Sequence, residues 1–421
     1  MSLGTRIANG EDATVETIST GFQQHPPRTR TEEIFRGRPN ASYPPSLPLT
    51  SCGRLDSPPV RPTGVLDRRP LVVAVAPFAV ALLACSFRLG SPDICGEDEA
   101  ADASVVWEMA ENGHWLLPFF NDEMVPEKPP LFYWVVAGVA RLLGRVDEVS
   151  VRLPSVVMAA ITVATVFFAG RYLVGASAAL LASLITLSAP MTIARAQLGR
   201  VDMTLVTCTT GAFFASVFAL NPKAPRRQRN VFWLLAALAV LAKASAGLGI
   251  VLCGTLAVAI ADRKRLGHLV TPEGIVAFGL LAFSWYALAS WRLGRNFVTA
   301  NLVGENLKLL VGGTSHEAVS RSLKSMLNTP VVSLAAGLMP WSFFAALRFR
   351  RWSAWDRGAR LAVAWTAAGL GFFTAADTRH TYYVAPLVPP VACFSQPSCS
   401  PSGRRHDGAG PPFSHRLPPS W

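Results

Sequence analysis

The sequence predicts an all-α polytopic membrane protein, and three observations support this class. Of the 421 residues, 51% are hydrophobic and only 16% are charged, whereas soluble domains contain about 25% charged residues. The chain also contains about ten apolar runs that are candidates for membrane spans. Basic clusters separate several of these runs, as in the cytoplasmic loops of membrane proteins. The net charge of +12 therefore indicates topology rather than nucleic-acid binding.

The two ends of the chain differ from its middle. Residues 1–70 are polar and rich in Pro, Arg and Thr, which predicts a disordered cytoplasmic tail. The first apolar run begins only at Leu71, too late for a signal peptide. Residues 395–421 have no apolar period, so we expect a disordered or frame-shifted tail and a membrane domain truncated at its C-terminus. The membrane domain is expected over 71–394.

The first span is predicted at 71–87, and a large external loop follows at 88–152. This loop contains the acid-rich segment 96–130, whose plainest interpretation is a solvated loop. The apolar run 131–144 is short and contains Arg141, so we expect an interfacial or re-entrant helix rather than a span. With 131–144 outside, the basic clusters fall inside, and one outer face gathers Asp98, Glu127, Lys128, Arg200 and Asp202.

Further spans complete the predicted topology. A pair of spans is expected to hinge at Arg171-Tyr172, and a later pair to break near Lys243. A second long external loop is predicted at 292–330. The predicted spans after the first loop are 152–170, 176–194, 203–220, 231–247, 248–261, 271–291, 331–347, 361–374 and 382–394. The seven cysteines are scattered without a CxxC pair, which argues against a disulfide framework or zinc module.

The charged groups of the predicted outer face suit chemistry on a phosphate. A carboxylate can act as a general base on an acceptor hydroxyl. A second carboxylate with a histidine can hold a divalent ion, and Lys or Arg can neutralise a phosphate as fixed charges. A solvated loop histidine at His316 and a snorkelling interface lysine at Lys128 are the alternatives. A lipid-linked-sugar transporter also fits the apolar runs, although transporters hold their ionisable groups near the bilayer midplane.

Several ordered motifs resemble one known family. They are Asp98-Glu99, WEMAENGHWLLPFFNDEMVPEKPPLFYW, VRLPS and ARAQLGRVDM, followed by LAKAS, ENLKLLVGG…H, PWSFF and RHTYYVAPLVPP. Together they resemble the ArnT-like branch of the dolichyl-phosphate-mannose-protein mannosyltransferase superfamily. The resemblance implies the GT-C fold of membrane glycosyltransferases, a polyprenyl-phosphate sugar donor and inversion at the anomeric carbon.

The resemblance also implies roles for individual residues. Asp98, with Glu99 and Asp202, would be catalytic. The donor phosphate would be bound by Lys128, Arg200 and Arg379, and a divalent metal ion by Glu127 and His316. No organic cofactor is implied. The sequence departs from the family pattern at Asp102, where a tyrosine is common, and after His316, where an aromatic run is usual.

The expected function is transfer of a sugar to a lipid A-type glycolipid or another envelope acceptor. A protein O-mannosyltransferase is the first alternative, and a lipid-linked-sugar transporter or a catalytically inactive truncated relative is the second. The expected location is the bacterial cytoplasmic (inner) membrane, with many spans and a cytoplasmic N-terminus. The expected partners are the donor, a lipid or glycan acceptor and membrane lipids, with no nucleic acid.

Overall fold

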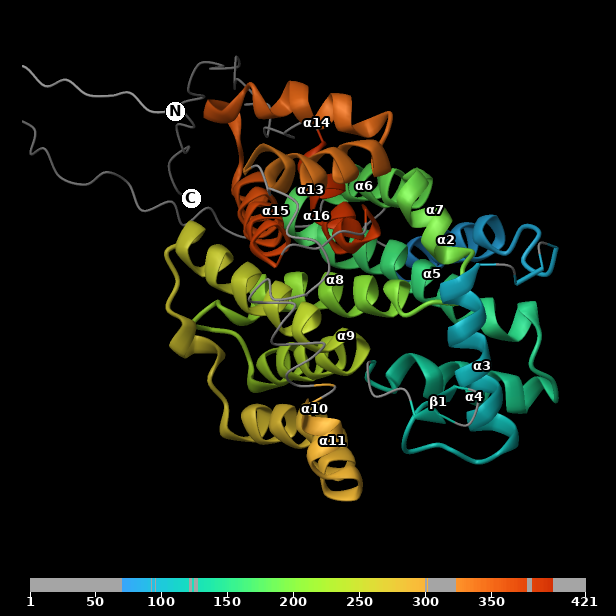
Figure 1. Ribbon diagram of the computed structural model, residues 1–421. Helices are drawn as coiled ribbons and strands as arrows, with labels where there is room; N and C mark the ends of the chain where they lie inside the picture. The colour runs from blue at the N-terminus through green and yellow to red at the C-terminus, as the bar shows by residue number, and fades with distance from the viewer. Residues whose placement is uncertain are drawn as a thin grey trace, which may run out of the picture. The chain divides into compact units, whose positions relative to one another are not determined.

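The computed structural model confirms the all-α class (Figure 1). It describes residues 70–91, 93–94, 96–120, 123–124, 128–299, 301, 323–376 and 381–396. Within these ranges the strands are two short segments, β1 (Phe119–Phe120) and β2 (Glu123–Met124), which pair antiparallel. The tails were predicted at 1–70 and 395–421, of which residues 1–69 and 397–421 lie outside the described residues. Residues 302–322, most of the second external loop predicted at 292–330, also lie outside them.

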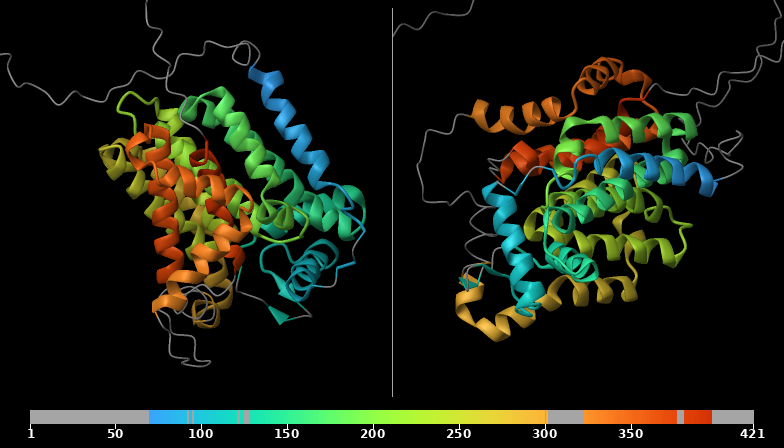
Figure 2. Two further views of the ribbon diagram at one scale, coloured as in Figure 1. Left: turned by 90° about the horizontal axis from the view of Figure 1, so that it is seen from above. Right: turned by 90° about the vertical axis from the view of Figure 1, so that its right-hand side faces the viewer.

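The N-terminal helices build the surroundings of the acid-rich segment. Helix α2 (Pro70–Cys85) lies along α5 (Figure 2). Helix α3 (Glu97–Glu111) packs against α4 (Leu131–Leu143), and α4 also contacts α5. Thirteen residues of helix measure about 20 Å, less than the ~30 Å hydrocarbon core of a bilayer. Helix α4 therefore has the length of the interfacial helix that was predicted here.

Helix α5 (Glu148–Val174) is a continuous helix of 27 residues. Asp147 and Ser150 form a capping box at its start. The predicted hinge at Arg171-Tyr172 is wrong, because both residues are helical and the break lies at Gly175. Gly175 has a φ of 90°, a conformation that glycine adopts without steric cost. Helices α6 (Ala176–Ser188) and α7 (Pro190–Ala196) follow, with a bend of 60° between them.

Helix α9 (Arg226–Ala261) turns back on itself near its middle. It packs against α8 (Asp202–Ala219), α10 (Pro272–Leu293) and α15 (Arg357–Ala375). Lys243 and Ala244 leave the helical conformation, and a Cβ at Gly247 would overlap the carbonyl oxygen of Ala239. Residues eight apart in a straight helix are about 12 Å apart. The predicted break near Lys243 is therefore confirmed, as the turn of a helical hairpin.

The remaining elements complete the C-terminal half. The segments 330–337 and 341–349 are bent by 119° to each other. The elements are η1 (Leu266–Leu269), α11 (Arg295–Phe297), α13 (Leu323–Gly337), α14 (Trp341–Phe349), η3 (Trp352–Ala354), η4 (Thr381–Leu387) and α16 (Val388–Phe394).

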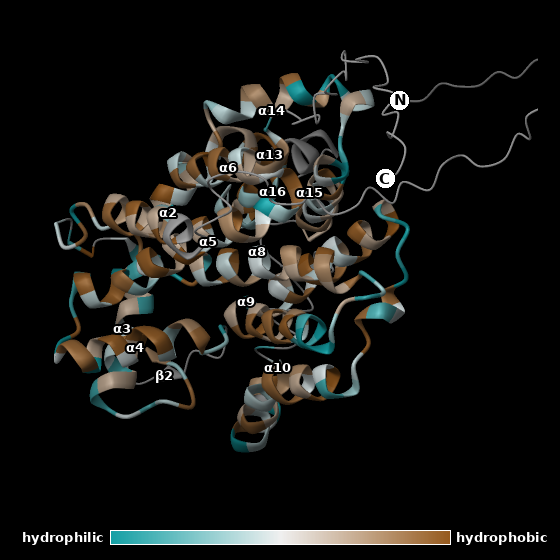
Figure 3. Ribbon diagram, turned by 180° about the vertical axis from the view of Figure 1, so that it is seen from behind, coloured by the Kyte–Doolittle hydropathy of each residue, from teal (hydrophilic) through white to brown (hydrophobic). Residues whose placement is uncertain are grey.

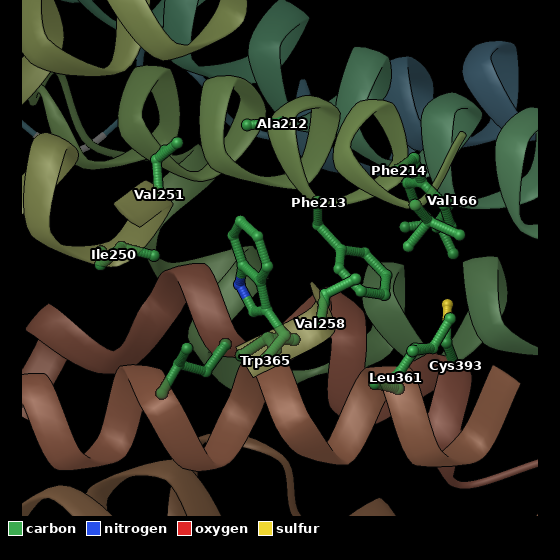
Figure 4. Close-up of a cluster of buried hydrophobic side chains, with 14 of the residues drawn as sticks. Val166, Ala212, Phe213, Phe214, Ile250, Val251, Val258, Leu361, Trp365 and Cys393 are labelled. Carbon is green, nitrogen blue, oxygen red and sulfur yellow. The ribbon is translucent and has the colours of Figure 1, made fainter. Parts of the chain in front are cut away.

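The largest buried core lies where α8, α9 and α15 meet (Figure 4). Trp365 is fully buried, and its ring lies 5.3 Å from that of Phe213. Gly254 of α9 leaves room for the indole, because a Cβ there would overlap the Trp365 ring. This packing fixes the second half of the α9 hairpin against α15.

Hydrophobic residues run along most of the helices, and hydrophilic residues gather in the connecting segments (Figure 3). In the described part of the chain, four helices are long and apolar enough to cross a membrane, or up to six if each bent pair counts as one span. Three shorter apolar helices accompany them. The membrane class is thus supported, while the number of about ten spans stays a prediction.

Candidate active site

Charged side chains gather where several parts of the chain meet. These are the first turns of α3, the segment before α4, the end of α7, the entry to α8, the turn of the α9 hairpin and η4. Among the described residues, the charged members are Asp98, Asp102, Lys128, Arg195, Arg200, Asp202 and Lys243. We call this set the charge cluster.

Asp98 is the most accessible carboxylate of the charge cluster. Its side chain is 57% exposed, and its Oδ2 lies 2.6 Å from Nη1 of Arg200. The guanidinium holds the carboxylate in place and leaves it accessible from outside. This arrangement suits a group that must receive a proton from another molecule.

Glu99 faces the interior on the other side of the same helical turn. Its two oxygens accept hydrogen bonds from Nε and Nη2 of Arg152, at 2.8 and 3.0 Å, and one also accepts from the Gly199 backbone N–H at 2.8 Å. Burial alone would raise the pKa of Glu99, but these hydrogen bonds and the Arg152 charge hold it below its ordinary value. This geometry suits a scaffold role rather than the predicted catalytic one.

Asp102 lies one helical turn after Asp98 and is 1% exposed. Its Oδ1 accepts from Nζ of Lys128 at 2.8 Å and from the Tyr133 hydroxyl at 2.7 Å. Its Oδ2 has no hydrogen-bond partner among the described residues and lies 4.0 Å from Nε of Arg200. Burial would lower the pKa of Lys128, but the Asp102 charge and hydrogen bond raise it above its ordinary value. Lys128 therefore stays a cation.

Asp202 begins α8 and is 3% exposed. Lys243 donates to its Oδ1 at 2.8 Å, and Nη1 of Arg195 lies 3.8 Å from its Oδ2. The α9 turn explains how Lys243 reaches this position, because both Lys243 and Ala244 have non-helical backbone angles. Ala244 has a φ of 34°, which is uncommon for a residue with a Cβ and occurs mostly where a site requires it.

Two tyrosines of η4 cover the cations. The Tyr382 ring faces Arg195 and Arg200 at 5.0 and 4.8 Å, and its hydroxyl accepts from Nη2 of Arg200 at 3.2 Å. Nζ of Lys243 lies 4.1 Å from the centre of the Tyr383 ring. Cation–π contacts of this kind hold the charged heads in place without neutralising them.

The charge cluster has an excess of positive charge. Its three aspartates are each within 2.8 Å of one cation, while Arg195 approaches Asp202 only to 3.8 Å. Four cations and three anions leave one net positive charge among the described residues. The arrangement therefore favours an incoming anion such as a phosphate.

The structure brings five of the predicted site residues together: Asp98, Glu99, Lys128, Arg200 and Asp202. The predicted metal ligands Glu127 and His316 and the predicted phosphate ligand Arg379 lie outside the described residues. Within the described residues, no three His, Cys, Asp or Glu side chains form a metal-binding group. The described residues thus supply no ligand set for the metal ion, which stays a prediction.

Sequence reasoning missed Asp102, Tyr133, Arg195, Tyr382 and Lys243 as members of the site. Two signals pointed to Lys243 and Asp102. A lysine inside an apolar run carries a high cost in a bilayer and usually has a partner and a function. Asp98 and Asp102 have the spacing of one helical face, which places both carboxylates toward the same neighbours.

Comparisons with known proteins found similar sequences and a similar fold. A family model described as dolichyl-phosphate-mannose-protein mannosyltransferase matches residues 127–291. An undecaprenyl phosphate-alpha-4-amino-4-deoxy-L-arabinose arabinosyl transferase of Erwinia tasmaniensis is 26% identical over 313 residues. That match covers 70% of this chain and 53% of the relative, and a protein of the same description from Yersinia pestis matches equally well. The chain thus spans about half the length of these curated relatives.

The fold comparison is equally clear. The crystal structure of ArnT from Cupriavidus metallidurans bound to undecaprenyl phosphate superposes with a TM-score of 0.68 at 23% identity. The match covers 78% of this chain and 59% of that protein. The protein is therefore a helical membrane protein with the GT-C fold. The predicted relationship to the ArnT-like branch of the dolichyl-phosphate-mannose-protein mannosyltransferase superfamily is confirmed.

Proposed function

We propose that the protein is a membrane glycosyltransferase that moves a sugar from a polyprenyl-phosphate donor onto an acceptor hydroxyl. The reaction would take place at the outer face of the bacterial cytoplasmic membrane. The observation that carries the proposal is the accessible Asp98 carboxylate, held by Arg200 beside a cluster with excess positive charge. The relatives named for undecaprenyl-phosphate-linked sugar transfer support the same donor class.

The described side chains divide the transfer chemistry between them. Asp98 accepts the proton of the acceptor hydroxyl while the oxygen of that hydroxyl attacks the anomeric carbon of the donor. The bond from that carbon to the phosphate oxygen breaks, and its electron pair stays on the phosphate. Attack from the face opposite the leaving phosphate inverts the anomeric carbon. Lys128, Arg195 and Arg200 stabilise the charge that develops on the phosphate, and Arg379 is proposed as a further phosphate ligand.

The acceptor follows from the relatives rather than from the cluster. We propose a lipid A-type glycolipid or another envelope glycan, because the sequence motifs resemble the ArnT-like branch and the chain is similar in fold to an ArnT. The description of the matching family favours a protein hydroxyl instead, which makes a protein O-mannosyltransferase the second candidate. Transfer assays with both acceptor classes distinguish the two.

The decisive experiment measures release of polyprenyl phosphate by the purified protein in lipid, with polyprenyl-phosphate sugars and crude envelope acceptor. Asp98→Asn should lower the transfer rate by about 10²–10⁴-fold, as expected for loss of a general base. Asp262→Asn is the matched control, because Asp262 forms a 2.6 Å pair with Arg357 away from the site. A parallel sample with chelator tests the proposed metal at Glu127 and His316.

Each outcome has a distinct meaning. Wild-type turnover that depends on Asp98 and not on Asp262 supports the glycosyltransferase. Full activity of Asp98→Asn contradicts the assignment of the base. A folded wild-type protein that turns over no donor would leave the inactive relative as the better description.

A further inference from the structure

The buried carboxylate of Asp102 is a feature of the charge cluster to which the transfer chemistry assigns no role. It lies in contact with Lys128, one of the cations assigned to the donor phosphate. A phosphate and Asp102 therefore compete for the same ammonium group. Asp102 cannot turn away to solvent, because it is 1% exposed and held by the Tyr133 hydroxyl.

The second carboxylate oxygen of Asp102 lies near Arg200, another cation assigned to the phosphate. Oδ2 has no hydrogen-bond partner among the described residues, and neither has Nε of Arg200 at 4.0 Å. Oδ2 of Asp202 also has no such partner and lies 4.0 Å from the same Nε. Two buried carboxylate oxygens thus face one guanidinium at the place where a phosphate would arrive. The repulsion between these two carboxylates and an added negative charge is stronger there than it would be in water.

The two phosphates of the proposed reaction differ in charge. The donor is a phosphodiester with one negative charge. The product is a phosphomonoester whose second ionisation has a pKa of about 6, so that it carries about −1.5 to −2 at pH 7. A cluster with one excess positive charge is neutralised by the donor and overcompensated by the product.

We propose that Asp102 weakens the binding of the doubly charged phosphomonoester product relative to the singly charged phosphodiester donor, and so favours product release. This inference rests on the proposed function. It makes Asp102 a residue that sets specificity between substrate and product.

The test compares two lipids that differ by one charge, undecaprenyl phosphate and its methyl ester, a phosphodiester without a sugar to transfer. Binding of each lipid is measured near pH 8 with wild-type protein, Asp102→Asn and Glu108→Gln. Asparagine keeps the shape and the acceptor oxygen for Lys128 and Tyr133. Glu108 is a matched control, because it is a buried carboxylate of the same helix that pairs with Asn112 outside the cluster.

In Asp102→Asn, the affinity for the monoester should rise about tenfold relative to that for the methyl ester, as expected for removal of a nearby charge in a partly buried site. Glu108→Gln should leave the ratio unchanged. An unchanged ratio in Asp102→Asn, with both lipids still bound, overturns the inference and leaves the proposed function intact. Wild-type protein that binds neither lipid overturns both.

A measurement on the wild-type protein alone covers the case in which Asp102→Asn does not fold. As the pH falls from about 8 to about 5.5, the monoester becomes singly charged while the methyl ester does not change. Relative affinity for the monoester should rise over this range. Relative affinity that falls as the phosphate loses charge contradicts the inference.

Discussion

Asp98 and Glu99 are neighbours in the chain, and each forms an ion pair with an arginine, yet their surroundings differ completely. The side chain of Asp98 is 57% exposed, and its Oδ2 lies 2.6 Å from Nη1 of Arg200. That of Glu99 is 5% exposed, and Arg152 and the Gly199 backbone occupy both of its oxygens. The comparison teaches that exposure and free bonding capacity, rather than charge, separate the candidate base from the scaffold.

The largest effect on stability is expected at the buried ion pair of Glu99 and Arg152. Glu99→Gln should lower the free energy of unfolding by about 3–5 kcal/mol, because it removes the charge of Glu99 from beside the buried Arg152 guanidinium. Thermal unfolding in detergent measures the loss. The double variant Glu99→Gln with Arg152→Met should cost less than the sum of the two single changes. Additive costs would show that the two groups do not act as a pair.

The pH dependence of stability follows from the same pair. The pKa of Glu99 is lower in the folded protein than the value of about 4.3 in an unfolded chain. Its contribution is therefore complete above about pH 4.3 and is lost as the pH falls through the folded value. The difference in melting temperature between wild type and Glu99→Gln should shrink in acid. A difference that grows in acid would reverse the sign of the assignment.

Asp202 stands between the two extremes, since it is buried but depends on the α9 turn for its partner Lys243. Gly247→Ala should cost about 1–3 kcal/mol of stability and lower the transfer rate, because the new Cβ would displace Ala239 and with it the turn. Gly279→Ala is the matched control: it adds the same methyl to helix α10 where there is open space. Equal behaviour of the two variants would show that the turn does not hold the site.

The smallest effect on stability is expected at the ion pair of Asp98 and Arg200. Asp98→Asn should lower the free energy of unfolding by less than Glu99→Gln does, because the Asp98 side chain is 57% exposed and stays hydrated, although its partner Arg200 is only 10% exposed. The same preparations that show the large loss of transfer should therefore melt close to wild type. A loss as large as that of Glu99→Gln would remove the distinction between the two carboxylates.

The helical membrane class could be predicted because apolar runs separated by basic clusters are typical of membrane-spanning helices. The break near Lys243 was predicted because this lysine interrupts an apolar run. The break at Gly175 was missed because the sequence near a helix end does not fix the residue at which the helix stops. The roles of Asp98 and Glu99 could not be separated, because adjacent residues face opposite sides of a helix and only packing decides which side is buried. Asp102 was noted as an unusual residue, but its partners Lys128 and Tyr133 are 26 and 31 residues away.

The turn in α9 also has a consequence for how the protein is made. Each half of the hairpin is about 25 Å of helix. Lys243 lies at the turn between the two halves and therefore at the tip of the hairpin. Asp202 lies 41 residues before Lys243, so α8 and its carboxylate are synthesised before the lysine that pairs with it. The two helices are synthesised consecutively, so the ion pair can form as soon as the hairpin emerges. Assembly of the active site would then begin during synthesis, before α10 to α16 exist.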